Sequence, residues 1–351
     1  MRKSLKDISW LVTEEEYRAD SALSYSTLAR YEREGFNNID KLFDKIESPS
    51  LTFGSMVDTL ITSGQEEFYK LFFIAEFPQL SDTLIKIVKR LFSIYKDRCT
   101  NINDIPTDDI IYITQEENYQ LNWKPETRVK VIKEKCGEYY NLLYIAGDRT
   151  IVDIETYKSV LNCVDTLHNH AATKFFFEEN NPFDSSIERF YQLKFKATLN
   201  NVTYKCMVDE LVLCHNDKTI QPIDLKTSCN KSDREWDFAK HYIGLMYQLQ
   251  NRLYVRILQD VISKDDTYKD YKILPYKDII IFNDSNTPMV YDIPFTHAQG
   301  TLYFGKNKQI EMRDPFDIGN ELDFYLKNRP RVPIGFHENC SNDIEIQLNK
   351  L

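Results

Sequence analysis

This 351-residue sequence offers no candidate for a membrane-spanning helix, because no apolar run approaches the roughly 18 residues that such a helix requires. The first residues are basic, but neither a continuous apolar stretch nor the small residues of a signal-peptide cleavage site follow them. The GxxxxGK(S/T) sequence of a P-loop is also missing, which excludes a nucleotide-driven motor of that class. These absences predict a protein that neither spans a membrane nor carries a secretion signal.

Cysteine has no pattern in this chain. The seven cysteines are scattered, without a CxxC pair or the spacing of a metal finger. An odd, dispersed set is typical of free thiols in a reducing compartment. We therefore expect an intracellular, cytoplasmic protein.

The charge balance is acidic, with a net charge of −10, which argues against indiscriminate coating of nucleic acid. It does not exclude an enzyme that contacts phosphates through a local basic path and carries acidic catalytic groups. Two basic segments, 84–98 and 128–135, are candidates for such a path. A solvated helix face is the alternative for both.

The spacing of apolar residues divides the chain into three parts. Residues 1–180 have mostly helical spacing, whereas residues 286–351 have a weak pattern and are expected to form an α+β extension. Between them, residues 181–285 predict a core of strands and one helix. The expected strands are 187–199, 201–214, 219–228 and 278–284, and the expected helix is 238–258. The predicted fold class is α/β, with a mixed β-sheet flanked by helices and a mostly helical N-terminal half.

Three charged residues are the leading candidates for chemistry. Asp224 and Lys226 are two positions apart in one expected strand, so their side chains point to the same face. A hairpin pairing with the preceding strand would bring Asp209 opposite them. Carboxylate oxygens suit Mg²⁺, which activates water and neutralises phosphate charge. A nearby lysine can orient that water or stabilise developing negative charge.

The alternative is that these are ordinary exposed positions, because an Asp-x-Lys sequence arises often by chance. The flanking residues favour the catalytic interpretation. The strand reads TIQPIDLKTS, and its apolar positions predict a buried strand. Buried charges are rare unless they are paired or bind a metal.

The segments VTYKCMVDELVL and TIQPIDLKTS resemble the paired signature of PD-(D/E)xK nucleases of the RecB/RecE type, a gxxDxv strand followed by (D/E)xKT. QLQNRLYV is similar to their QxxxY helix, and LTFGSMVDTLIT to the fGxxxHxxlL helix of RecE-like phage exonucleases. IETYKSVLNCVDTLHNHAATKFFF resembles the helix before their first core strand. The likeness covers about residues 20–260, in the right order, and implies a restriction-endonuclease-like core.

The resemblance assigns roles to the central residues. It implies that Asp209 and Asp224 bind the metal, that the Leu225 carbonyl is a further ligand, and that Lys226 positions the water. The branch often lacks the proline of the superfamily name, and here Val208 precedes Asp209.

The helix motif adds Gln250 and Tyr254, which share a face and are expected to contact the DNA backbone near the metal. Taken alone, Tyr254 would rather pack in the core and Gln250 would be solvated. Glu188, on the first core strand, is a candidate for an additional ligand or water-holder, with a solvated strand residue as the alternative.

Asp58 stands where the family usually has a metal-binding histidine, and a carboxylate there is a natural Mg²⁺ ligand. The alternative is a polar residue on a solvated helix face. Gly54, one turn earlier, would allow another backbone to approach closely. The resemblance implies no iron–sulfur cluster, because the members that bind one need three clustered C-terminal cysteines, and only Cys340 follows Cys229.

The resemblance implies Mg²⁺-dependent hydrolysis of DNA phosphodiesters, with Mn²⁺ as a substitute. The expected substrate is duplex with a free end, degraded exonucleolytically in recombination or DNA processing, with a single-strand annealing protein as partner. If the chain is phage-encoded, it would act in the host cytoplasm. A structure-specific endonuclease or resolvase and a catalytically silent DNA-binding module are the alternatives. The sequence leaves polarity, processivity and homo-oligomer formation open.

Overall fold

The computed structural model describes residues 3–44, 48–228, 241–283, 285–293, 300–304 and 308–329. The chain forms two compact units, one from Met1–Gly54 with Asp165–Leu351 and the other from Ser55–Val164. These units differ from the three predicted parts because the first residues join the sheet. The Leu23 amide donates to the Thr203 carbonyl over 3.0 Å, and Leu23 bridges Tyr204.

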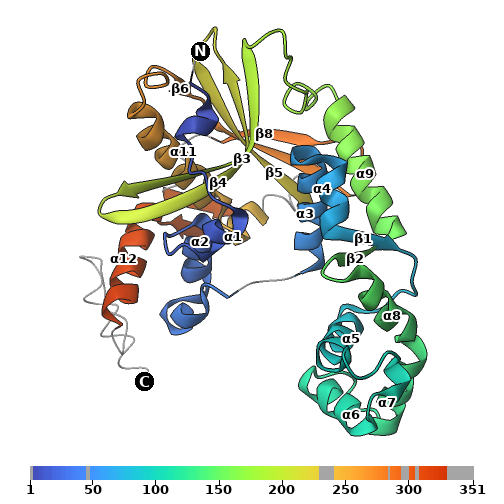
Figure 1. The fold of residues 1–351 in the computed structure, drawn as a ribbon. Coiled ribbons are helices and arrows are strands. Elements are labelled where there is room, and N and C mark those ends of the chain that lie inside the picture. The colour runs from blue at the N-terminus through green and yellow to red at the C-terminus, as the bar shows by residue number, and fades with distance from the viewer. Residues whose placement is uncertain are drawn as a thin grey trace. The chain divides into compact units, whose positions relative to one another are not determined.

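The first unit contains a mixed six-stranded sheet, ordered β3-β4-β5-β7-β8 with β6 beside β5 (Figure 1). The pairs β3–β4, β4–β5 and β7–β8 are antiparallel, whereas β5 pairs with β6 and β7 in parallel. The strands are β3 (Ile187–Leu199), β4 (Val202–Cys214), β5 (Thr219–Ser228), β6 (Lys272–Ile273), β7 (Tyr276–Phe282) and β8 (Met289–Ile293).

A two-residue turn fixes the register of β3 and β4. Asn200 and Asn201 both have positive φ angles, 51° and 65°, which two-residue hairpin loops require and asparagine tolerates. Leu199 consequently pairs with Val202, and the pairing continues along the hairpin to Ile187 and Cys214. This confirms the hairpin expected at these asparagines.

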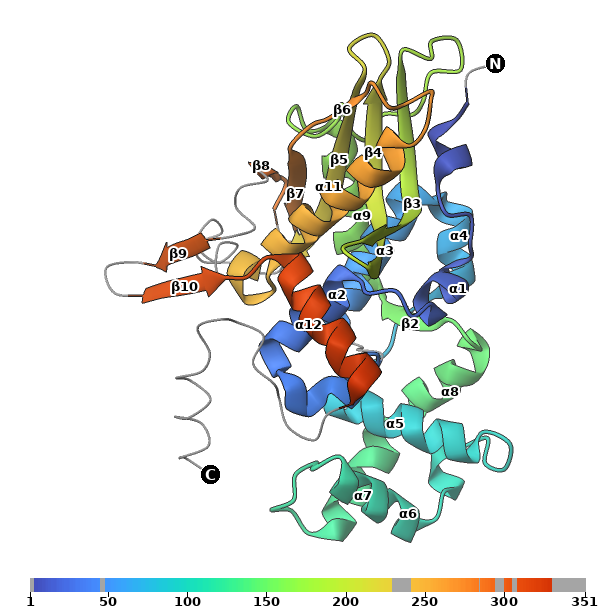
Figure 2. The ribbon, with the colours of Figure 1, turned by 90° about the vertical axis from the view of Figure 1, so that its left-hand side faces the viewer.

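Helix α11 (Tyr247–Ser263) covers one face of the sheet (Figure 2). Its apolar side chains enter the main core together with strand residues such as Tyr204 and Ile220. Helices α2 (Tyr25–Glu34) and α12 (Pro315–Asn328) pack against α11 and against each other. The unit also contains η1 (Leu5–Ile8), α1 (Glu14–Ala19), η2 (Phe36–Lys41) and the antiparallel pair β9 (Gly300–Phe304) and β10 (Lys308–Met312).

The second unit is mostly helical and has its own core. Its helices are α4 (Gly64–Leu71), α5 (Asp82–Tyr95), η3 (Ile102–Asp104), α6 (Thr107–Glu116), α7 (Pro125–Lys135) and α8 (Gly137–Ala146). A short parallel pair, β1 (Phe72–Ala75) and β2 (Thr150–Asp153), accompanies them. Helices α3 (Pro49–Thr62) and α9 (Ile154–Asn169) each run across a boundary between the units.

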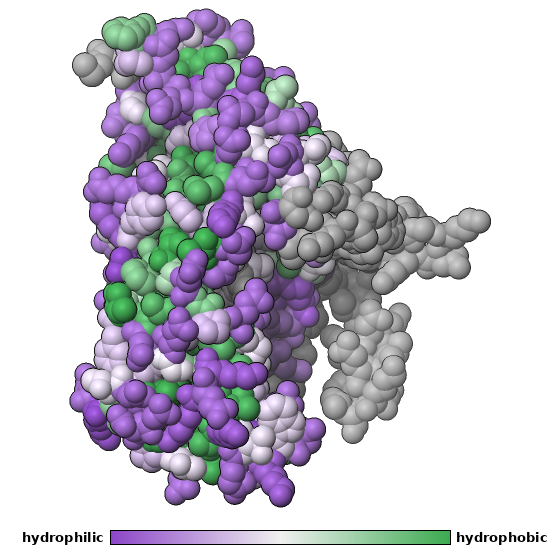
Figure 3. All heavy atoms as spheres, turned by 90° about the vertical axis from the view of Figure 1, so that its right-hand side faces the viewer, coloured by the Kyte–Doolittle hydropathy of each residue, from purple (hydrophilic) through white to green (hydrophobic). Residues whose placement is uncertain are grey.

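Buried residues of α5 to α8, including Leu91 and Tyr140, make up the core of this second unit. On the surface drawn in Figure 3, hydrophobic residues are interspersed with hydrophilic ones. Helix α5 contains residues 84–95 of the first predicted basic segment, but Lys86 and Arg90 are paired with Glu117 at 2.6 and 3.0 Å. These pairs reduce the free positive charge of the helix that was a candidate DNA path.

The predicted α/β class, with a mixed sheet flanked by helices, is confirmed. Within the part of the chain that the structure describes, no helix is both long and apolar enough to cross a membrane.

The expected helix 238–258 differs in its start, since α11 begins at Tyr247 and residues 229–240 lie outside the described residues. Met246 has a left-handed φ of 58° and separates α11 from the preceding residues.

Candidate active site

The β4–β5 pairing changes character at Asp209. The described register ends at Glu210 and Ile223, and beyond it the Asp209 Oδ2 accepts the Leu225 amide at 2.9 Å. A side chain therefore replaces a backbone acceptor where the two strands separate. On the other side of β4, Gln192 has a φ of 54°, which marks a local distortion of β3 beside the same residue. The carboxylate of Asp209 is thereby held against the strand that carries Asp224 and Lys226.

Asp224 and Lys226 form a buried acid–base pair. Asp224 is 2% exposed, and its Oδ2 lies 2.5 Å from the Lys226 ammonium. Burial opposes the charge on Lys226, but the carboxylates of Asp224 and Asp209 and the nearby hydroxyls of Tyr247 and Tyr25 together outweigh it and raise the pKa of the lysine. The charged form of Lys226 is therefore favoured in this site.

Gln250 links the members of that pair. Its amide nitrogen donates to Asp224 Oδ1, and its Oε1 accepts from the Lys226 ammonium at 2.9 Å. Gln250 is 5% exposed, so it holds the acid–base pair from the core side. Gln250 lies on the helix face that packs onto the sheet, and its expected contact with DNA stays a prediction.

Tyr254 is also buried, with its ring centroid 6.2 Å from that of Tyr276. Burial raises the pKa of its hydroxyl well above the ordinary value. Core packing, the alternative drawn from the sequence, describes the environment of Tyr254, and its expected contact with DNA stays a prediction.

Sequence reasoning missed Asp278, a third carboxylate in the same region. It lies beside Asp224 because β5 and β7 pair in parallel, with Asp224 opposite Asp278. Asp278 is fully buried; its Oδ2 accepts from Asn251 at 3.3 Å, and Oδ1 has no hydrogen-bond partner among the residues described. Burial and then the charge of Asp224 raise its pKa to about 7. The strand was predicted, but nothing local in its sequence indicates which neighbour it pairs with.

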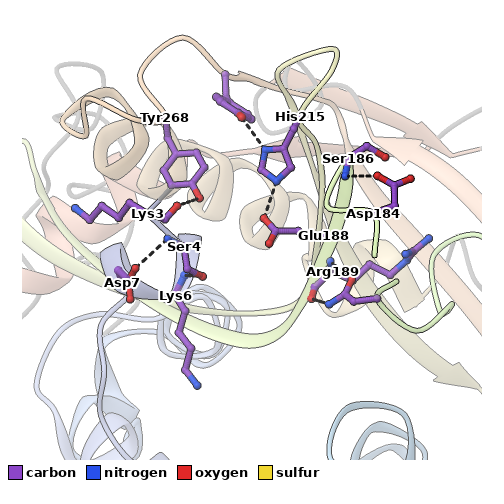
Figure 4. A network of polar contacts seen from close by, with 12 residues as sticks. Lys3, Ser4, Lys6, Asp7, Asp184, Ser186, Glu188, Arg189, His215 and Tyr268 are labelled. Atoms are coloured by element: carbon purple, nitrogen blue, oxygen red, sulfur yellow. Dashed lines mark hydrogen bonds and ion pairs between the residues drawn. The ribbon is translucent and has the colours of Figure 1, made fainter. Parts of the chain in front are cut away.

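Glu188 is placed elsewhere. It pairs with Leu213 in the hairpin, four positions along β4 from Asp209, and its Oε2 lies 2.6 Å from His215 Nε2 (Figure 4). The other ring nitrogen of His215 lies 2.7 Å from the Tyr271 hydroxyl. Glu188 therefore joins this polar contact at the end of the hairpin instead of the carboxylates of Asp209 and Asp224.

The helix LTFGSMVDTLIT, which carries Gly54 and Asp58, belongs partly to each of the two units. Asp58 is half-buried and belongs to the second unit, so its role as a metal ligand stays a prediction. Gly54 belongs to the first unit, where a Cβ built on it would lie 3.1 Å from Thr227 Oγ1. The atom that approaches Gly54 is therefore a side-chain oxygen of β5, where the sequence predicted a backbone.

The oxygen atoms of this site suit a small, hard cation that needs few protein ligands. Two carboxylates, Asp209 and Asp224, flank the Leu225 backbone, and Mg²⁺ uses one or two carboxylates while keeping several waters. Among the described residues, no three or more His, Cys, Asp or Glu side chains lie together in a group that could hold a metal. A site of this kind would take its oxygen ligands from Asp209, Asp224 and the Leu225 carbonyl.

Comparison with known proteins gives only distant likenesses. No family model matches the chain, and no curated protein matches it. The "Putative exonuclease" of Eubacterium rectale is 12% identical over 92% of this chain and 85% of its own, with a TM-score of 0.41. Protein VC1899 of Vibrio cholerae is 11% identical over 69% of this chain and 55% of its own, with a TM-score of 0.14. Neither likeness assigns a function to this chain.

Proposed function

We propose that this protein is a metal-dependent nuclease that hydrolyses phosphodiester bonds in DNA. One observation carries the proposal: the Asp209 carboxylate accepts a hydrogen bond from the amide of Leu225. Leu225 is the residue between Asp224 and Lys226, which form an ion pair with each other. Burying a carboxylate and an ammonium together costs desolvation free energy, which their attraction offsets only with good geometry and further hydrogen bonds. Strongly perturbed groups with a specific charge partner are typical of functional sites.

Each residue has a role in this proposal. Asp209, Asp224 and the Leu225 carbonyl would hold Mg²⁺, or Mn²⁺ as a substitute. The metal would supply activation of water and neutralisation of phosphate charge. The Lys226 ammonium would orient the attacking water or stabilise negative charge on the phosphate. Gln250 fixes the positions of the Asp224 carboxylate and the Lys226 ammonium by bonding to both.

The substrate form is a finer part of the proposal. The order of the sequence motifs supports exonucleolytic action on duplex with a free end, in recombination or DNA processing, with a single-strand annealing protein as partner. A structure-specific endonuclease or resolvase on the same core is the second candidate.

The decisive experiment compares end-labelled linear duplex with covalently closed circles in the presence of Mg²⁺. Progressive loss of label from the linear DNA, abolished by EDTA and restored by Mg²⁺ or Mn²⁺, is expected. Nicking of circles would instead favour the endonuclease. Absence of metal-dependent cleavage of either substrate by the folded protein would leave a silent DNA-binding module.

A further inference from the structure

Tyr247 lies directly against the catalytic lysine. It is the first residue of α11, and the Lys226 ammonium lies over its ring, 4.1 Å from the centroid. Met246, with its left-handed φ, sets the position from which the helix starts. Lys226 therefore has a third neighbour in addition to Asp224 and Gln250, and this one is an aromatic face.

We propose that Tyr247 is a positioning residue for Lys226, holding its ammonium through a cation–π contact. The inference rests on the proposed nuclease function and identifies a residue that this function requires. A cation over an aromatic face is attracted by the negative face of the ring, most strongly where water is excluded. The side chain of Lys226 is only 16% exposed, so the contact lies in such an environment.

The need for a neutral partner follows from the double task of Asp224. This carboxylate pairs with Lys226 at 2.5 Å, and it is also a proposed metal ligand. A cation held by Asp224 would weaken the attraction between its carboxylate and the ammonium, and would repel the ammonium directly. The ring of Tyr247 carries no net charge and is not a ligand for a hard cation. It can therefore retain the lysine under both conditions.

The alternative is that Tyr247 only fills space. It packs with Tyr242 against Ile280 and Phe282, and its ring centroid is 6.1 Å from that of Tyr242. Packing depends on shape, whereas a cation–π contact depends on the electron density of the ring. Fluorination separates the two, because it withdraws electron density with little change of size.

The first test replaces Tyr247 with phenylalanine and then with mono-, di- and trifluorinated phenylalanine. Tyr247→Phe is expected to stay within about twofold of wild-type kcat, and successive fluorines to lower kcat stepwise to about tenfold below it, with KM little changed. The same series at Phe282, a fully buried member of the same cluster, is the matched control and should leave kcat level. A level series at position 247 would overturn the proposal.

The second test needs no activity. In the metal-free and DNA-free protein, the ε-methylene protons of Lys226, labelled with ¹³C and assigned by Lys226→Arg, should show an upfield ring-current shift. The shift should persist in Tyr247→Phe and vanish in Tyr247→Leu. If the wild-type protein lacks the shift, the contact does not exist and the proposal is wrong. If the shift is present but no metal-dependent cleavage occurs, the nuclease function fails, and the catalytic role of the contact fails with it.

Discussion

Two acid–base contacts lie in the same sheet and differ in how fully their polar atoms are satisfied. At the end of the hairpin, His215 has a partner on each ring nitrogen, and Glu188 retains 29% exposure of its side chain. Around Asp224, by contrast, two carboxylates lie side by side in the core, and Asp278 keeps an oxygen without a hydrogen-bond partner among the described residues. The first arrangement is explained by stability, because every strong donor and acceptor of the histidine is used. The second is unfavourable for folding alone, which indicates that it is retained for binding or chemistry.

The largest expected effect is a difference in cleavage rate between a substitution at Asp224 and a matched substitution at Glu188. Asp224→Asn is nearly isosteric but removes the charge, so cleavage should fall by about 10²- to 10³-fold or more. Glu188→Gln, the matched carboxamide change at the other contact, should leave kcat within about twofold of wild type. Rates on linear duplex, with circular dichroism to confirm folding, provide the measurement. Equal loss in both variants would remove the distinction between the regions.

Asp58 tests whether the Asp224 region uses a further carboxylate. The family resemblance predicts that Asp58→Ala loses most activity, about tenfold or more, because one metal ligand is removed. Asp58→His should keep a measurable part of the activity, with a shifted metal optimum. A full Mg²⁺ titration of each variant provides the measurement. Wild-type rates for Asp58→Ala throughout that titration would show that Asp58 is not a ligand.

Asp278 should make the free energy of unfolding depend on pH. Its pKa is raised to about 7 in the fold, against an ordinary value of 3.8, so the folded protein holds a proton that the unfolded chain releases. The contribution to the free energy of unfolding should therefore fall as pH rises from about 4 to about 7 and then level off, by on the order of a few kcal/mol.

This dependence should be measured as the midpoint of thermal unfolding against pH, in the absence of metal. Asp278→Asn cannot ionise and should reduce the slope between pH 4 and 7, while Asp292→Asn, on the more exposed Lys277–Asp292 pair, serves as a control. An unchanged slope in Asp278→Asn would show that its carboxyl titrates normally.

The smallest effect belongs to the satisfied contact. Glu188→Ala removes the acceptor of a nearly buried His215 nitrogen and should lower the free energy of unfolding by about 1–3 kcal/mol. Its effect on kcat should be small, since Glu188 lies four positions along the sheet from the rung of Asp209. Urea unfolding, compared with Glu188→Gln, gives the measurement. A large loss of kcat without loss of stability would reverse the interpretation of this region.

Much of the sheet was predictable because its determinants are local. Alternating apolar residues indicated β3 and β4, and the Asn200–Asn201 pair indicated their turn. The two-residue spacing of Asp224 and Lys226 likewise places both on one face without knowledge of the fold. These features depend only on the strand and the turn in which they occur.

The remaining parts of the site depend on pairing across long distances. Asp278 reaches Asp224 through a parallel register that no turn specifies, because a helix intervenes between β5 and β7. The rotation of α11 decides whether Gln250 faces DNA or the Asp224–Lys226 pair, and the QxxxY spacing fits both. Tyr247 acquires its neighbour only through the left-handed residue before α11. The sequence identified Asp209, Asp224 and Lys226, whereas Asp278 and the partners of all these residues came from the tertiary structure.

The substitution of a side chain for a backbone acceptor at Asp209 gives this protein an internal reporter. The Leu225 amide is protected from solvent exchange by a carboxylate, not by the facing strand. A ligand that draws the Asp209 oxygens away would leave that one amide less protected, while the neighbouring amides of β5 remain bonded within the sheet. Deuterium uptake at Leu225 would then increase as the site fills, opposite to the protection that binding usually confers. Occupancy of the site would thus be recorded at a single peptide group of the strand that carries Asp224 and Lys226.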